Sequence, residues 1–157
     1  MSGAAPSLVL DHVGIAVRSV NESIERWTTV FGYRQATEVV LNTRQQVRVV
    51  FLERAGSLAI KLIEPADPAS PIAAFVRRGG GLHHLCFRAP SVEAEVARLE
   101  ALGSRVVSPP EPGEAFGDEL ISFLYVGDGI TIELIDTDRR ARRLFEQDSA
   151  DSTDGAA

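Results

Sequence analysis

Four residues of this 157-residue chain are of the types that build catalytic and metal sites: His12, Lys61, His84 and Glu133. Two imidazoles and a carboxylate form a common ligand set for an open divalent-metal site. A lysine ammonium has no lone pair, and its charge repels a cation. If the four residues meet, they predict one of two sites. Either three ligands hold a metal with Lys61 turned aside, or no metal binds and Lys61 pairs with Glu133.

An internal repeat with an offset of 72 positions is the reason to expect that these residues meet. The offset superimposes His12 on His84 and Lys61 on Glu133. Such self-similarity indicates two homologous modules, and pseudo-twofold packing of the modules would bring all four residues to one site. We place the modules at residues 8–65 and 82–136, with a linker at 66–81. Other blocks that align without gaps are 10–12 with 82–84, 19–20 with 91–92, 51–52 with 123–124, and 60–64 with 132–136.

Each module is expected to fold as βαβββ, from alternating apolar strands and one capped helix. Asn21 is the expected N-cap of the first helix and Ser91 that of the second. The predicted fold class is α+β: two tandem βαβββ modules with pseudo-twofold symmetry form a concave mixed β-sheet, with the helices outside. The predicted strands lie at 9–17, 46–52, 58–64, 82–88, 120–126 and 130–135, with weaker ones near 34–40 and 104–107, and the predicted helices at 20–31, 72–76 and 91–102.

Strand alternation decides which side chains face the concave side of the sheet. His12 shares that face with Gly14 and Ala16, whereas His83 is expected to point away as a structural residue. Apolar residues at repeat-related positions can line the concavity, together with two residues on the face of His84. The predicted substrate-binding residues are Val49, Phe51, Cys86, Arg88, Ile121 and Phe123.

The lysine content singles out Lys61. Fifteen of the 16 basic residues are arginines, and the one lysine lies inside the apolar run 58–63. Burying a lysine is costly unless it has a partner. Lys61 is therefore expected to have a partner or a function, and its repeat equivalent Glu133 is the candidate partner.

Composition limits the classes of function. A net charge of −6 and a pI near 5.1 argue against broad nucleic-acid binding. No apolar run approaches the about 18 residues that span a bilayer, and no leader pattern is seen, so a soluble cytoplasmic protein is expected. The single cysteine excludes an intramolecular disulfide. Residues 137–157 are expected to form a basic segment, with 139–143 as a solvated helix face, and a disordered acidic tail.

Residues 10–17, 70–75, 81–84 and 129–134 carry a resemblance to a known family. Over residues 8–136 the sequence resembles the methylmalonyl-CoA epimerases of the vicinal oxygen chelate (glyoxalase/bleomycin resistance/dioxygenase) superfamily. The resemblance implies that His12, His84 and Glu133 bind a metal that polarises a thioester carbonyl, while a carboxylate removes the α-proton. It also implies a possible homodimer.

The chain departs from this family at two positions. Lys61 stands where the family has a glutamate or glutamine ligand. Residues 46–49 carry a valine near the position at which some members have an additional base glutamate. The resemblance therefore implies the fold more directly than it implies the reaction.

Three functions remain open from the sequence. The favoured one is isomerase- or epimerase-type proton transfer next to the carbonyl of a small-molecule carbonyl or acyl-thioester substrate, with Lys61 and Glu133 as catalytic residues. The second is a metal-free isomerase or cyclase of a polyketide-like metabolite. The third is a non-catalytic, resistance-type binding protein. We favour an enzyme because four polar groups converge, with either a divalent metal or no cofactor, and expect neither nucleic acid nor membrane as a partner.

Overall fold

The structure is a computed structural model that describes residues 6–146. Within this range the chain forms one mixed sheet of nine strands, flanked by helices. The strands are β1 (Val9–Ala16), β2 (Arg34–Gln35), β3 (Val40–Asn42), β4 (Val47–Glu53), β5 (Ala59–Pro65), β6 (Gly81–Arg88), β7 (Arg105–Gly113), β8 (Glu119–Tyr125) and β9 (Thr131–Ile135). The helices are α1 (Val20–Phe31), α2 (Ala73–Arg77), α3 (Val92–Ala101) and the short 3-10 helix η1 (Glu114–Phe116).

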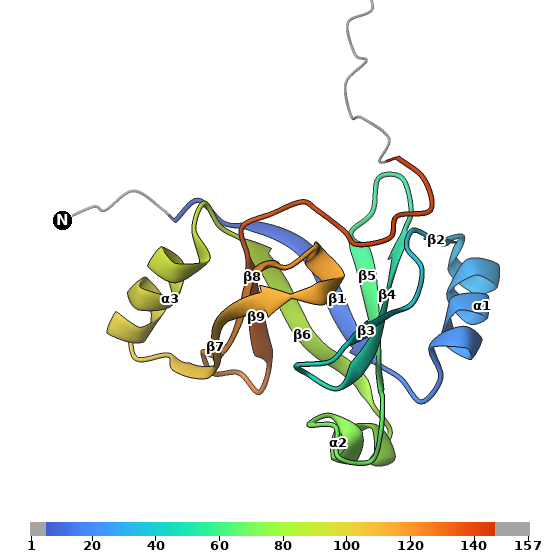
Figure 1. Cartoon of the computed structure of the whole chain (residues 1–157), viewed down its shortest axis with the longest axis horizontal. Helices are drawn as coiled ribbons and strands as arrows, with labels where there is room; N and C mark the ends of the chain where they lie inside the picture. The colour runs from blue at the N-terminus through green and yellow to red at the C-terminus, as the bar shows by residue number, and fades with distance from the viewer. Residues whose placement is uncertain (1–5, 147–157) are drawn as a thin grey trace, which may run out of the picture.

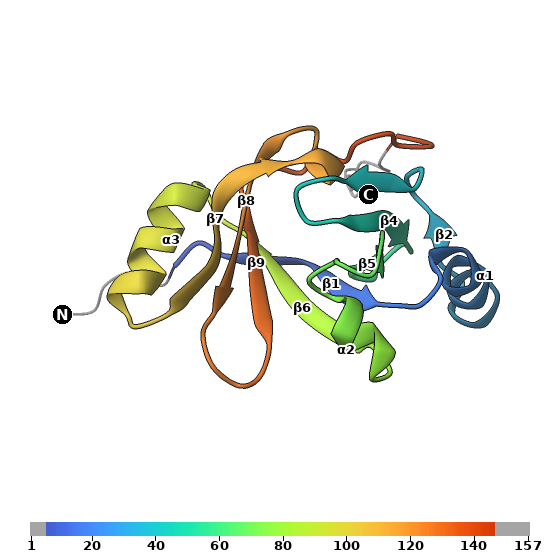
Figure 2. The same cartoon turned by 60° about the horizontal axis from the view of Figure 1, so that its bottom comes forward.

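The sheet has a pseudo-twofold arrangement about its central pair of strands (Figures 1 and 2). Its order is β2-β4-β5-β1-β6-β9-β8-β7, with β3 paired to β4. β1 and β6 run antiparallel at the centre, and each has a parallel neighbour on its outer side, β5 for β1 and β9 for β6. The predicted α+β fold of two βαβββ modules is confirmed.

Three apolar clusters hold the sheet. One lies under α1 around Val50 and Leu62, and its counterpart lies under α3 around Leu124 and Leu134. The third covers the opposite, concave face and includes Phe51. The two helices therefore pack on one face of the sheet, and the other face is left to form the interior of the site.

The N-caps of α1 and α3 are repeat-related serines. Ser91 accepts a hydrogen bond from the Ala94 amide at the start of α3, as predicted. At the start of α1 the corresponding cap is Ser19, whose hydroxyl accepts from the Glu22 amide, so the expectation of Asn21 was wrong. The helix begins one residue before Asn21, and the 72-residue offset from Ser91 leads directly to Ser19.

Some predicted elements differ from the structure. The strand expected near 104–107 continues to Gly113 through three prolines, which an edge strand such as β7 tolerates. The strand expected near 34–40 is divided into β2 and β3. Residues 139–143 are not helical, and the tail from residue 147 lies outside the described residues.

Residues 137–146 instead form an irregular segment, here called the C-terminal strap, which crosses from the second module to the first (Figure 1). The Ala141 amide donates to Ala115 in the second module, and the Leu144 amide donates to Ala36 in the first. Arg143 also pairs with Glu53 at 2.8 Å. Long apolar helices are absent from the described part of the chain, and none there could span a membrane.

Candidate functional site

The four residues singled out by the repeat meet in the interior of the sheet, each from a different strand. Lys61 Nζ lies 2.8 Å from Oε1 of Glu133. His12 Nε2 and His84 Nε2 lie 2.9 and 3.0 Å from the other oxygen, Oε2. All four residues are at most 2% exposed. A buried cluster of a carboxylate, an ammonium and two imidazoles therefore joins the two modules.

Gly14 makes room for this cluster. It lies opposite Lys61 on β5 and opposite His84 on β6. A Cβ built on Gly14 would lie 2.0 Å from Cε1 of His84, so the imidazole rests directly on the β1 backbone. Sequence alternation placed Gly14 on the concave face. It did not reveal that position 14 must be a glycine because the His84 ring fills the space of a side chain there.

Two bulges place a further residue beside each histidine. In the β1–β6 pairing, Asp11 and His83 have no partner, because the register shifts at each of them. A bulge re-aims a side chain. Asp11 accordingly lies 2.7 Å from Nδ1 of His12, and His83 Nδ1 lies 2.9 Å from Nδ1 of His84. The expectation that His83 points away was wrong for this reason.

The two bulge residues are themselves related by the repeat, since Asp11 aligns with His83 at the same 72-residue offset. Each module thus supplies a pair in which a bulge residue orients a histidine. Sequence analysis missed both as functional residues. The signal was present in the alignment of residues 10–12 with 82–84.

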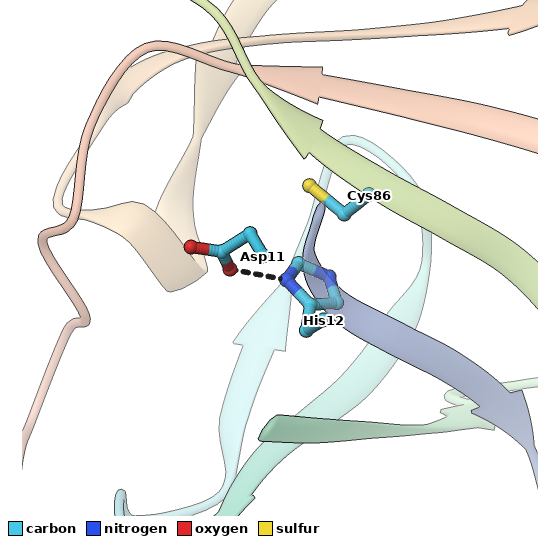
Figure 3. A group of neighbouring side chains, drawn as sticks. All are labelled: Asp11, His12 and Cys86. Carbon is cyan, nitrogen blue, oxygen red and sulfur yellow. Dashed lines mark hydrogen bonds and ion pairs between the residues drawn. The ribbon is translucent and has the colours of Figure 1, made fainter. Parts of the chain in front are cut away.

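Figure 3 shows the pair of the first module, with the Asp11 carboxylate hydrogen-bonded to the His12 ring and Cys86 beside them. Burial raises the pKa of the Asp11 carboxyl, but the His12 hydrogen bond and the Arg140 charge together lower it below its usual value. Arg140 of the C-terminal strap pairs with this carboxylate. Burial also raises the pKa of the Cys86 thiol well above its usual value, so Cys86 stays a neutral thiol and a poor ligand in the Asp11–His12–Cys86 group.

The central groups have strongly altered acidities. Burial by itself would raise the pKa of Glu133, but the Lys61 charge and contacts with His84 and His12 hold it well below its usual range. Burial lowers the pKa of His84 to about 3, so its ring is neutral at pH 7. Burial and the Lys61 charge also lower the pKa of His83. The carboxylate is therefore ionised while the paired imidazoles of the second module are neutral.

Aromatic rings enclose the Lys61 ammonium. Its Nζ lies 4.9 Å from the centroid of Phe116 and 5.9 Å from the centroids of Phe51 and Phe123. Of the predicted substrate-binding residues, Val49, Phe51, Cys86 and Ile121 are at most 1% exposed and pack together on the concave face, with Phe123 partly buried against them. Arg88 lies at the margin, 38% exposed and 3.6 Å from Asp11.

A surface groove ends beside the His12–Asp11 pair. This groove of about 800 Å³ reaches Asp11, Arg88 and Arg140, but neither Lys61 nor Glu133 lines it. The Arg140 guanidinium stacks 4.5 Å from the Phe51 centroid and 5.1 Å from that of Phe116. The strap thus separates the groove from the buried cluster.

The residues present partly fit a divalent metal. Ligand atoms of His12, His84 and Glu133 all lie within 4.8 Å of one another. Asp11 hydrogen-bonds the far nitrogen of His12, as carboxylates do behind metal-bound histidines. His84 Nε2 lies 3.0 Å from Oε2 of Glu133, but the contact lacks hydrogen-bond geometry among the described residues.

Lys61 opposes this fit. A divalent ion about 4 Å from its ammonium would be repelled by about 8 kcal/mol at an effective dielectric constant of about 20. That cancels about half or more of the about 10–16 kcal/mol that a complete zinc site gains. With Lys61 charged and bound to Glu133, the donor set does not fit a tightly held divalent ion.

Comparison with known proteins places this chain in a family. Residues 11–123 match the family described as the glyoxalase/bleomycin resistance protein/dioxygenase superfamily. The chain belongs to this superfamily. Human mitochondrial methylmalonyl-CoA epimerase is 32% identical over 129 residues, which is 80% of this chain and 72% of the relative.

Solved structures of this superfamily agree with the fold. Methylmalonyl-CoA epimerase from Mycobacterium tuberculosis is 34% identical with a TM-score of 0.75, and the match covers 86% of this chain and 93% of that one. A methylmalonyl-CoA epimerase in complex with methylmalonyl-CoA and NH4+ is 27% identical with a TM-score of 0.71, covering 82% of this chain and 94% of that one. Within the superfamily, the chain is therefore similar to the epimerases over most of its length.

Proposed function

We propose that this protein is an acyl-CoA epimerase that inverts the carbon next to a thioester carbonyl, with a 2-substituted malonyl-CoA as its substrate class. The observation that carries the proposal is the buried cluster of Lys61 and Glu133 with two imidazoles, in a chain similar to methylmalonyl-CoA epimerases over about four fifths of its length. Epimerisation needs a base for the α-proton and a positive group for the enolate oxygen. The cluster contains both kinds of group.

Glu133 is the proposed base and Lys61 the proposed partner of the carbonyl oxygen. In the resting site each neutralises the other at 2.8 Å. When the ammonium turns to the thioester oxygen, Oε1 of Glu133 loses its strongest partner. Its basicity then rises as the α-carbon comes within reach. Exclusion of water by the surrounding rings strengthens both interactions.

The arginine-rich groove suits the anionic part of an acyl-CoA. Five arginines and three acidic residues line it, and one of the arginines, Arg140, ends beside Asp11. Relatives solved with CoA thioesters support this substrate class. The cytoplasmic location and the possible homodimer expected from the sequence stay predictions, to be checked by fractionation and by light scattering.

Deuterium exchange tests the reaction. Purified protein is incubated with one epimer of methylmalonyl-CoA in D2O, and mass spectrometry follows label at C2 while a chiral assay follows inversion. We expect label and inversion together, and a fall of about 100-fold or more in Glu133→Gln. Arg142→Met is the control, because this strap arginine is 67% exposed and pairs with the exposed Glu38. Absence of exchange across a panel of branched acyl-CoA thioesters contradicts the proposal.

A further inference from the structure

We infer that the Lys61 ammonium is the resident cation of this site and stands in for the divalent metal that the superfamily resemblance implies. The inference rests on the proposed function only for the identity of the oxygen that the ammonium stabilises. That Lys61, and no metal, supplies the positive charge follows from the contacts of the side chain itself.

The first support is how the donor atoms of the cluster are already used. Lys61 donates a hydrogen bond to Oε1 of Glu133, and His12 contacts Oε2. Both oxygens of the one buried carboxylate therefore have partners within the chain. His84 Nε2 lies 3.0 Å from the same Oε2, so a divalent ion reaches this carboxylate only by displacing contacts that the chain already makes.

The second support is the aromatic enclosure of Nζ. Phe51, Phe116 and Phe123 come from β4, η1 and β8 and place their ring centroids 4.9–5.9 Å from the ammonium. Ring faces attract an organic cation within about 6 Å. They offer no lone pair to a metal, and they occupy space that water ligands of an open metal site need. The surroundings are those of an ammonium site.

The third support is the position of Lys61 in the repeat. It is the 72-residue equivalent of Glu133, and the two side chains meet across the β5–β1–β6–β9 centre of the sheet. The Lys61 ammonium therefore lies where it can stabilise the same carbonyl oxygen that a metal ion bound by His12 and His84 would stabilise. Unlike an ion, it is covalently held and cannot be removed by a chelator.

The reaction balances without a metal. The α-C–H bond breaks and its proton passes to Glu133, while the electron pair moves through the carbonyl to the thioester oxygen. A Lys61 N–H donates a hydrogen bond to that enolate oxygen. A proton from solvent adds to the opposite face of the enolate carbon and forms the new C–H bond as the carbonyl re-forms, and Glu133 then gives its proton back to solvent, so no net proton is gained or lost. No oxidant or reductant takes part.

Because Lys61 is the only lysine of the chain, it can be observed by itself. Protein labelled with [15Nζ]lysine should give one slowly exchanging ammonium signal by NMR. We expect this signal to be unchanged by one equivalent of Mn²⁺, a paramagnetic probe that would erase it from a neighbouring site. We also expect metal analysis after chelation to find far less than one equivalent, with the rate of α-proton exchange unaltered.

Lys61→Glu is the matched variant, because it gives the carboxylate that the family resemblance places there. We expect it to bind one equivalent of Mn²⁺ at least about 100-fold more tightly than the wild type, by calorimetry, and to lose that binding when His84→Gln is added. Lys61→Gln serves the same purpose if Lys61→Glu does not fold, and the wild-type measurements need no variant.

Stoichiometric metal in the wild type that erases the Lys61 signal and disappears in His84→Gln would overturn the inference. So would a folded Lys61→Glu that binds no metal, since the lysine charge would then not be what excludes the ion. A metal-free wild type that keeps the ammonium signal but shows no α-proton exchange upholds the resident cation and refutes the proposed function instead.

Discussion

Replacing Lys61 by methionine measures how much the fold depends on the buried ion pair. Methionine fills similar space without charge or hydrogen-bond donors. Glu133 is fully buried and Lys61 is 2% exposed, so the variant leaves a carboxylate in the interior without its ammonium. Breaking a buried pair from one side costs about 3–5 kcal/mol, against a total stability of about 5–15 kcal/mol. We expect a loss of this size in the free energy of unfolding at pH 7.

The loss should depend on pH with a defined sign. In the wild type the pKa of Glu133 lies well below 4.5, so the contribution of the pair is fully present above that value and is lost as the pH falls through the folded pKa. Without the Lys61 charge, burial is less fully offset, so we expect the folded pKa of Glu133 to be raised relative to the wild type. The deficit of Lys61→Met should therefore shrink as the pH falls through this raised pKa.

A double-mutant cycle isolates the pair from the packing of the new side chains. Glu133→Gln alone leaves the ammonium without its carboxylate and is also expected to destabilise the fold. In Lys61→Met with Glu133→Gln no unpaired charge remains, so the double variant should be more stable than the sum of the two single losses predicts. We expect a coupling of about 2–3 kcal/mol, at the upper end for contacting residues.

Urea unfolding is the assay, followed by far-UV circular dichroism and by fluorescence of Trp27, the only tryptophan. Trp27 lies on α1 with its ring 4.9 Å from Phe31, outside the site, so the probe does not report on the variants directly. Losses that add within about 0.5 kcal/mol would refute the claim that the two residues stabilise each other.

Two further predictions concern acid stability and the strap. Burial lowers the pKa of His84 from 6.5 to about 3, so the contribution of the neutral ring to the free energy of unfolding is fully present above pH 6.5 and falls as the pH drops toward 3. In urea titrations between pH 6.5 and 4.5, the wild type should lose about 2–3 kcal/mol more than His84→Gln. Equal losses in the two proteins would contradict this prediction. Arg140→Met should lower the unfolding free energy by about 2–4 kcal/mol, because its guanidinium is 7% exposed, paired with Asp11 and stacked on Phe51. Arg142→Met on the same strap, 67% exposed, should change it by less than about 0.5 kcal/mol, and similar effects of the two variants would count against the strap being held at Arg140.

The repeat offset made the fold and the central site residues predictable. One number, 72, relates His12 to His84, Lys61 to Glu133 and Ser19 to Ser91: the two histidines contact the same carboxylate, Lys61 pairs with Glu133, and the two serines cap equivalent helices. Where the offset was applied consistently it led to the right residue. Where local helix signals were used instead of the offset, they pointed to Asn21, whereas the N-cap of α1 is Ser19.

Other features needed three-dimensional information. Alternation assumes a regular strand, so it fails where the bulges turn Asp11 and His83 toward the histidines. The strap could not be predicted because three of its arginines, Arg140, Arg142 and Arg143, pair with acidic residues of the first module that lie far away in the sequence. Charge runs of this kind are usually solvated, and only tertiary contacts reveal the exception.

The departure from pseudo-twofold symmetry at Lys61 solves a problem of charge. Two equivalent carboxylates facing each other across the axis would repel in an interior where both are desolvated, and they would need an added cation to be stable together. With Lys61 in one of the two positions, the pair sums to zero and the neutral His84 adds no charge. A symmetric site with two carboxylates needs a bound cation to balance its charge. In this chain the balancing charge is the side chain of its only lysine, Lys61.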